Sequence, residues 1–356
     1  MAHVSDQPLG ISPNVPSDHH SQDRRSLPLE DSPYLLDEHG PLFILGCPRS
    51  GTTFLSRCIA DIPDIEEFVG VLAPPRVMHM IGYACDQGQP AKQLLRLVRD
   101  IFWQSFWRRR MFFSSRLAAA IVTRKPLGIL RKPTMADSIF CYKEPFLCFA
   151  ATEFANEFRN AKFIHIYRDG RDNADSMMRT YGDALTDAVL RDTFLVENKS
   201  SEVGMHREVR GYCMPWWVKP EDKQRFLDAS PFGRYVYMWR EMTLRAQALR
   251  RFGPERYLEI RYEEFVERPA QTIVRVSSFL NRSAAKSRKV RAAFNCSVGI
   301  SARRQDEQKL KEADQIAGDL LRSLGYPTSY SGLNAAAKTE CSSEDPTRGA
   351  LQHTHG

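Results

Sequence analysis

The sequence predicts an α/β fold: a parallel sheet of the phosphate-loop type, flanked by helices and interrupted by helical and irregular insertions. Two observations support this class. Short apolar runs of strand length recur along the chain, and each is followed by a stretch with the apolar spacing of a helix. The first run leads into a glycine-rich segment before its helix. This alternation is expected of βαβ units, in which successive strands lie parallel in one sheet.

The predicted elements follow in order along the chain. Residues 42–45 form an apolar run closed by Gly46, and residues 52–59 have helical spacing, so this unit is a strand, a tight loop and a helix. Further buried strands are predicted at 139–142, 162–167 and 257–262. The second strand leads into a helix-like stretch at 146–158. Together these units predict the parallel sheet.

We expect one domain over residues 41–326. It lies between an N-terminal arm, 1–40, rich in Ser, Pro, Asp and His, and a C-terminal tail, 327–356, that turns to Ser, Thr, Ala and Gly. Both flanking segments are predicted to be disordered. The domain carries two insertions, about 74–132 with a helical middle and 181–230 with irregular structure. Long excursions from a compact sheet often recognise the substrate.

Composition narrows the classes of ligand and compartment. The formal charge of +7 suits an anionic nucleotide, but without long basic blocks it gives little support for nucleic acid. The 8 cysteines include no C-x-x-C pair, so no metal site or disulfide framework is indicated. The first forty residues have no apolar core of a signal peptide, and no run approaches the roughly 18 apolar residues of a membrane span. We therefore expect a cytoplasmic protein without a transmembrane segment.

The strongest signal is the segment Gly46–Thr53, GCPRSGTT, called here the phosphate loop. Its G-x-x-x-x-G frame lies between a strand and a helix, where backbone N–H groups and the helix dipole hold an anion. Thr52 stands where nucleotide triphosphatases have Lys, and a cation appears instead at Arg49, whose planar fork suits phosphate or sulfate oxygens. The loop is thus better suited to a phosphosulfate bound without metal than to Mg-ATP. The alternative is a glycine-rich turn with an incidental arginine.

A second group of charges ends the strand at 162–167. Arg168, Asp169, Arg171 and Asp172 follow it directly, and Ser176 comes eight residues after Arg168. Ligands of parallel sheets bind at the carboxyl ends of the strands. Arg168 and Ser176 could both reach one phosphate, the first by an ion pair and the second by a hydrogen bond. The alternative is that these charges pair with one another at a solvated helix start.

These segments together resemble the sulfotransferase family. Pro48–Leu55 is similar to its 5′-phosphosulfate loop, in the form with Arg found in tyrosylprotein and many bacterial sulfotransferases, and Arg168 and Ser176 match its 3′-phosphate pair. Lys143-Glu144-Pro145 is similar to its Lys-x-Pro element, whose Lys faces the transferred sulfate. The resemblance spans roughly residues 41–326. It implies 3′-phosphoadenosine-5′-phosphosulfate as the co-substrate and no metal.

Two later segments extend the resemblance. The run beginning Arg261-Tyr262 looks like the late strand and helix of the family, which implies that Tyr262 lies near the adenine. Arg303 and Arg304 precede a helix that resembles the C-terminal segment closing on the 3′-phosphate. The implied donor-binding residues are therefore Arg49, Ser50, Gly51, Thr52, Thr53, Arg168, Ser176, Tyr262, Arg303 and Arg304.

The resemblance implies in-line displacement at sulfur, with adenosine 3′,5′-bisphosphate as the leaving group. Arg49, Lys143 and the loop N–H groups would stabilise charge on the sulfuryl and leaving oxygens more strongly in the transition state than in the ground state. Thr52 and Thr53 would add hydroxyl donors. For Lys143 the alternative is an ordinary surface lysine at a strand end.

The general base departs from the family pattern. Tyrosylprotein sulfotransferases use a Glu shortly after the first helix, and alignment on Pro75-Arg76 places Val69 or Gly70 at that point. Glu66 and Glu67 lie nearby, and His79 is a further candidate because imidazole titrates near neutral pH. For each of the three the alternative is an ordinary surface residue, which residues of these types more often are.

The missing Glu argues against protein tyrosine as the acceptor. We expect a hydroxyl of a small molecule, a lipid or a carbohydrate, which aromatic residues at 103, 107, 212, 216 and 217 could cover if they are not core residues. Arg108–Arg110 beside Phe112-Phe113 could touch an anionic membrane surface or an acidic glycan, or form a solvated helix face. The rival functions are a phosphate-loop kinase, a non-catalytic nucleotide-binding protein and, last, a nucleic-acid binder.

Overall fold

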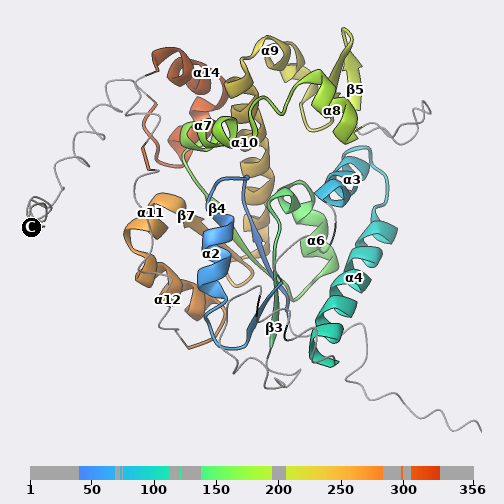
Figure 1. Cartoon of the computed structure of the whole chain (residues 1–356), viewed down its shortest axis with the longest axis vertical. Helices are drawn as coiled ribbons and strands as arrows, with labels where there is room; N and C mark the ends of the chain where they lie inside the picture. Colours follow the sequence, from blue (N-terminus) through green and yellow to red (C-terminus); the bar gives the residue numbers. More distant parts are fainter. Residues whose placement is uncertain are drawn as a thin grey trace, which may run out of the picture. The chain divides into compact units, whose positions relative to one another are not determined.

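The sheet confirms the predicted α/β class. A computed structural model describes residues 40–68, 73, 75–111, 117, 121, 138–194, 206–283, 298–299 and 306–328. Over these residues the main sheet has five parallel strands in the order β2-β3-β1-β4-β7. Strands β3, β4 and β7 of this sheet are labelled in Figure 1. Their bounds are Leu42–Leu45 for β1, Ile65–Phe68 for β2, Ile139–Lys143 for β3, Lys162–Tyr167 for β4 and Tyr257–Arg261 for β7. Strand β2 was not predicted.

Alternation along the central strand β1 divides the core into two layers. Leu42 and Ile44 belong to one cluster of buried residues, and Phe43 and Leu45 belong to the other. This is the two-residue period of a strand that is buried on both faces. The first layer is closed by three helices, α2 (Thr52–Ile59), α11 (Tyr262–Glu267) and α12 (Pro269–Phe279).

The second layer is larger and rich in aromatic residues. Phe43 packs edge-on against Phe154, with ring centroids 5.4 Å apart, and lies 5.4 Å from Phe163 on β4. The elements that cover this side are α3 (Pro75–Asp86), α4 (Lys92–Met111), η4 (Pro145–Ala150), α6 (Ala151–Glu157), α7 (Gly170–Tyr181), α10 (Pro231–Gln247) and α14 (Glu307–Ser323). Fully burying one such aromatic side chain contributes about 1.5–3 kcal/mol.

The second predicted insertion contains more regular structure than its sequence indicates. It includes an antiparallel hairpin, in which His206 pairs with Pro215. The elements after α7 are α8 (Asp187–Phe194), β5 (His206–Val209), β6 (Tyr212–Pro215), η5 (Pro220–Asp222) and α9 (Lys223–Asp228), and η6 (Ala248–Phe252) follows α10. The first insertion supplies α3 and α4. The predicted arm before Gly40 and the tail after Thr328 lie outside the described residues.

Candidate functional site

The phosphate loop connects the carboxyl end of β1 to the first turn of α2. Gly51 is the N-cap of α2, with φ 92°, and Arg49 has φ 71°. The first N–H groups of a helix have no acceptor within the helix. Because the N-cap is glycine, no N-cap side chain competes for them. The loop therefore presents backbone donors and the positive end of the helix dipole at the carboxyl edge of the sheet.

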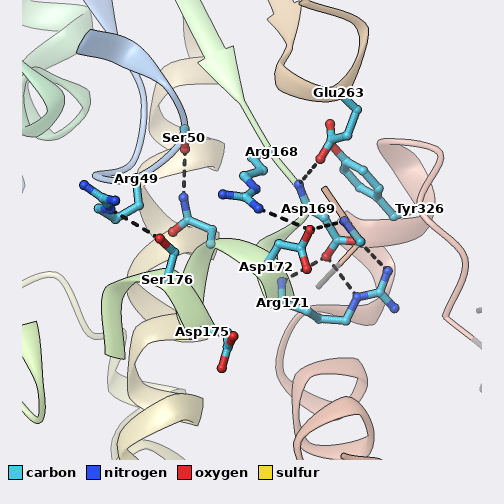
Figure 2. Close-up of polar contacts among 12 residues, drawn as sticks. Arg49, Ser50, Arg168, Asp169, Arg171, Asp172, Asp175, Ser176, Glu263 and Tyr326 are labelled. Carbon is cyan, nitrogen blue, oxygen red and sulfur yellow. Dashed lines mark hydrogen bonds and ion pairs between the residues drawn. The ribbon is translucent and has the colours of Figure 1, made fainter. Parts of the chain in front are cut away.

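The side chains of the loop are divided between its interior and its surface. Ser50 and Thr52 are buried, whereas Arg49 and Thr53 are exposed. Arg49 Nε donates to Ser176 Oγ on α7 over 3.3 Å (Figure 2). The loop cation and the predicted 3′-phosphate serine therefore lie together, although 127 residues separate them in sequence.

Arg168 is held separately from Ser176. Its guanidinium Nη2 lies 3.3 Å from Asp172 Oδ2, and its Cζ lies 4.8 Å from the centroid of the Tyr262 ring. The backbone N–H of Gly299 also donates to Asp172 Oδ2, over 2.7 Å. Arg168 is 3% exposed, so this pair is buried. The sequence-based alternative of mutual pairing is realised, but in the interior and not on a solvated face.

The first turn of α7 anchors the C-terminal segment of the chain (Figure 2). Asp169 caps the helix by accepting from the Arg171 backbone N–H, and its two carboxylate oxygens bind the Arg171 guanidinium over 2.9 and 2.7 Å. Arg171 Nη1 donates to the Pro327 carbonyl over 2.6 Å. A guanidinium that is 1% exposed needs such partners, because an unpaired buried charge is strongly unfavourable.

Glu263 completes this junction. Its carboxylate accepts from the Asp169 backbone N–H over 3.1 Å and from the Tyr326 hydroxyl over 2.8 Å. Burial raises the pKa of the Glu263 carboxyl above its ordinary value, and the hydrogen bond from Asp169 partly offsets this rise. The segment after α14 is thus fixed to both α7 and α11.

Lys143 is the last residue of β3 and pairs in register with Ile44, next to the start of the phosphate loop. Its side chain is half-buried. The following residue, Glu144, donates its backbone N–H to the Ile44 carbonyl over 3.1 Å and accepts from the Phe146 N–H over 3.0 Å. Burial raises the pKa of the Glu144 carboxyl. A cation and a buried carboxyl therefore lie beside the loop.

The candidate bases lie in three different environments. Glu66 on β2 is half-buried, whereas its neighbour Glu67 is buried and accepts from the Ser56 hydroxyl on α2. His79 on α3 is buried, and its Nδ1 accepts from Trp216 Nε1 over 3.2 Å. Burial, with a smaller contribution from the charge of Arg245, lowers the pKa of His79 to about 3. Val69 and Gly70 lie outside the described residues.

The remaining predicted residues lie at the loop, in the core or outside the described residues. The Tyr262 ring lies directly against Gly51, where a β-carbon would meet Tyr262 Cδ2 at 2.5 Å. Arg303, Arg304, Phe112 and Phe113 lie outside the described residues. Trp216 and Trp217 are core residues, 4% and 3% exposed.

Asn173 was missed by the sequence analysis. Its side-chain amide donates to the Pro48 carbonyl over 3.0 Å and to Ser50 Oγ over 2.9 Å. The spacing of Asn173 and Ser176 on α7, three residues apart, puts both on one helix face and could have indicated it. Asp172 stood in the quoted motif, but its role in holding Arg168 depends on burial that the sequence does not reveal.

The described residues contain neither a metal-binding cluster nor a helix suited to cross a membrane. No group of His, Cys, Asp and Glu in this part of the chain is arranged to hold a metal ion. None of the helices that the structure describes has both the length and the apolar character needed to cross a membrane. Neither finding bears on the segments outside the described ranges.

Two curated proteins are similar to part of this chain in sequence. Protein-tyrosine sulfotransferase 1 of Danio rerio is 29% identical over 183 residues, 45% of each chain, and the Mus musculus protein is 29% identical over 146 residues, 38% of this chain and 33% of its own. The chain spans less than half the length of these curated relatives.

Solved structures with low sequence identity also match. A sulfotransferase domain from the Synechococcus PCC 7002 olefin synthase has a TM-score of 0.39 at 15% identity, covering 78% of this chain and 94% of that domain. Sulfotransferase STF9 from Mycobacterium avium has a TM-score of 0.41 at 14% identity, covering 84% and 80%. The model of the sulfotransferase family matches residues 41–228, which is more than half of the sequence. The protein therefore belongs to the sulfotransferase family.

Proposed function

We propose that the protein transfers a sulfuryl group from 3′-phosphoadenosine-5′-phosphosulfate to a hydroxyl of a small-molecule, lipid or carbohydrate acceptor. The observation that carries this proposal is the phosphate loop, in which Arg49 replaces the cation of a nucleotide triphosphatase and lies beside Ser176. Membership of the sulfotransferase family supports the reaction class. The donor and the acceptor class are inferred from the chemistry of the site.

The residues present fit an anionic donor. Arg49 and Thr53 are exposed and Lys143 is half-buried. Their N–H and O–H groups are therefore accessible at the edge of the sheet where α2 begins and presents its first backbone N–H groups. The bound donor would supply an activated sulfuryl group with adenosine 3′,5′-bisphosphate as its leaving group. Arg49 and the loop N–H groups would hold the 5′ end, and Thr52 and Thr53 would add hydroxyl donors.

Charge stabilisation would decide the rate. In an in-line displacement the acceptor oxygen forms its bond to sulfur as the bond from sulfur to the phosphate oxygen breaks, and the acceptor proton passes to a base. Negative charge develops on the leaving oxygen. Lys143 ends the strand that pairs with β1, the strand before the loop, which supports the proposal that its ammonium group would stabilise this charge. A fixed cation of this kind acts more strongly in the transition state than in the ground state.

The 3′-phosphate would be read by Arg168 and Ser176, with Tyr262 near the adenine and Arg303 and Arg304 closing from the C-terminal side. The contact between the Arg168 guanidinium and the Tyr262 ring supports placing these two residues at one ligand. Because Asp172 already holds Arg168, a bound phosphate would share this guanidinium with the carboxylate. The two anions would contact different N–H groups of the fork.

Among the candidate bases the environments favour Glu66. Glu67 already accepts a hydrogen bond from the Ser56 hydroxyl. The Nδ1 lone pair of His79 accepts from Trp216, so the neutral ring carries its proton on Nε2 and has no second lone pair to accept the acceptor proton. A pKa of about 3 also makes His79 a weak proton acceptor near neutral pH. Of the two carboxylates, Glu66 is the less buried: Glu67 is 6% exposed, whereas Glu66 is half-buried, with its Oε2 atom in the interior.

A tyrosine hydroxyl is the second candidate acceptor. The names of the curated relatives favour it, since both are protein-tyrosine sulfotransferases. Against it stands the sequence position where those enzymes carry a glutamate, which is occupied here by Val69 or Gly70. An acceptor panel should therefore contain a tyrosine peptide beside sterols, phenols and sugars.

The test begins with calorimetric titration of adenosine 3′,5′-bisphosphate without added metal, compared with ATP and Mg²⁺. Metal-free binding of the bisphosphate is expected, followed by turnover with at least one acceptor of the panel. Arg49→Ala should abolish turnover, and Arg57→Ala, an exposed arginine at the far end of α2, serves as the matched control. A preference for Mg-ATP, or normal turnover by Arg49→Ala, contradicts the proposal.

Ser176→Ala gives a second, more specific test. It removes a hydroxyl that is proposed to contact the 3′-phosphate and that accepts from Arg49 in the structure. Binding of the bisphosphate should weaken more than binding of adenosine 5′-phosphate. Equal losses for the two ligands would mean that Ser176 does not read the 3′-phosphate.

A further inference from the structure

The side chain of Asn173, on α7, joins this helix to the phosphate loop. It is fully buried, and its amide nitrogen makes both of the contacts it can donate, to the Pro48 carbonyl and to Ser50 Oγ. These loop residues lie 125 and 123 positions away in sequence. The amide is therefore a long-range tether and not a local helix feature.

The tether holds the strained part of the loop. Pro48 and Ser50 are the immediate neighbours of Arg49, which has φ 71°. A non-glycine residue with positive φ is uncommon, and such strain persists only where the surrounding structure fixes it. With both neighbours bonded to one buried amide, the backbone at Arg49 is held in the conformation that presents its side chain toward Ser176.

The direction of the hydrogen bond also orients Ser50. Because Asn173 is the donor, Ser50 Oγ is the acceptor, and the Ser50 hydroxyl hydrogen is left for a second acceptor. The amide orientation is fixed by the Pro48 carbonyl, which cannot donate. Asn173 Oδ1 itself is buried and has no protein hydrogen-bond partner among the described residues. A buried acceptor without a protein partner lowers stability. The two hydrogen bonds to the loop are therefore the contribution of this side chain that the structure shows.

We propose that Asn173 is a positioning residue that holds the phosphate loop in the conformation that binds the 5′-phosphosulfate. This inference rests on the proposed function, because it assigns the loop to the 5′ end of the donor. The residue touches neither reacting atom and acts through Pro48 and Ser50. Its loss should therefore affect ligands with a 5′-phosphate and spare those that carry only a 3′-phosphate.

The test compares two variants with the wild type. Asn173→Leu removes both donors while keeping a side chain of similar size, and Asn173→Ala removes them without steric risk. Calorimetry would measure the affinity for adenosine 5′-phosphate and for adenosine 3′-phosphate. We expect the 5′-phosphate ligand to bind about tenfold more weakly, which corresponds to the loss of about one net hydrogen bond, and the 3′-phosphate ligand to change by less than about twofold.

Ser176→Ala supplies the matched control, with the opposite pattern expected. If the Asn173 variants bind adenosine 5′-phosphate as tightly as the wild type, the proposal is wrong. Equal weakening of both ligands would also overturn it, since that pattern indicates general damage to the fold. Failure of the wild type to bind either nucleotide would instead overturn the proposed function, so the two failures are distinguishable.

Discussion

Replacing Gly51 with alanine tests how closely the phosphate loop packs against the Tyr262 ring. Gly51 has φ 92°, and an added β-carbon would lie 2.5 Å from Tyr262 Cδ2 and 2.7 Å from Cε2. Real β-carbons do not approach other atoms so closely. Either the loop or the Tyr262 ring must shift, and that ring also lies against the Arg168 guanidinium.

Three terms set the size of the effect. A left-handed backbone costs alanine about 1–2 kcal/mol relative to its preferred conformations. Overpacking against a fixed neighbour typically costs about 1–3 kcal/mol more. Reduced freedom of the unfolded chain returns about 0.4–1 kcal/mol. We therefore expect Gly51→Ala to lower the free energy of unfolding by about 1–4.5 kcal/mol.

Gly88→Ala isolates the steric term. Gly88 also has a positive φ, 69°, but a β-carbon there would meet nothing within 4 Å. It should cost only about 1 kcal/mol, from backbone strain alone. Urea unfolding of both variants, followed by titration with adenosine 3′,5′-bisphosphate, measures the difference. If Gly51→Ala is no less stable than Gly88→Ala and binds the nucleotide normally, the fitted contact between the loop and Tyr262 is refuted.

Two other predictions concern groups buried elsewhere in the fold. Tyr326→Phe removes the hydroxyl that donates to Glu263, so its unfolding free energy should fall by about 1–2 kcal/mol in urea titrations, whereas Tyr181→Phe, at a residue 52% exposed, should have no effect. Burial lowers the pKa of His165 to about 4, below the ordinary 6.5, so the folded state resists protonation and stability should be lost as pH falls from about 6.5 toward 4. His165→Gln should flatten that part of the stability profile by up to about 3 kcal/mol; an unchanged acid slope would exclude His165 as its source.

Apolar runs in the sequence were enough to predict β1, β3, β4 and β7 of the main sheet. Strands β1, β3 and β4 are largely apolar runs buried on both faces, so composition and length alone mark them. Strand β7 has fewer apolar residues and is only partly buried, but Tyr257, Leu258 and Ile260 were enough to indicate a strand. The phosphate loop was predictable for a related reason. Its conformation needs glycine at Gly51, and a positive φ leaves a clear trace in the sequence.

Strand β2 shows where this reasoning stops. Its sequence, Ile-Glu-Glu-Phe, has two adjacent carboxylates and is too short and too polar to be identified as a strand by its pattern. It forms because β3 offers a free edge with which Ile65 to Phe68 can pair. Glu67 tolerates burial there because Ser56, on a different element, donates to it. Neither partner can be identified before the fold is known.

The charged start of α7 shows how position in the fold changes the meaning of a motif. By its sequence alone, the segment 168–172 fits a solvated helix start as well as a ligand site. In the first case its arginines and aspartates pair with one another, and in the second the arginines bind an anion. The deciding fact is that Arg171 is 1% exposed and that its partners include the Pro327 carbonyl, 156 residues away. Burial of this guanidinium therefore depends on the C-terminal segment being in place. The same segment brings Tyr326 to Glu263, which in turn holds the Asp169 backbone. Tyr326 and Pro327, in the segment after α14, thus help to hold the start of the helix that carries Asp172 and Ser176 and that follows Arg168. A sequence motif cannot express that dependence.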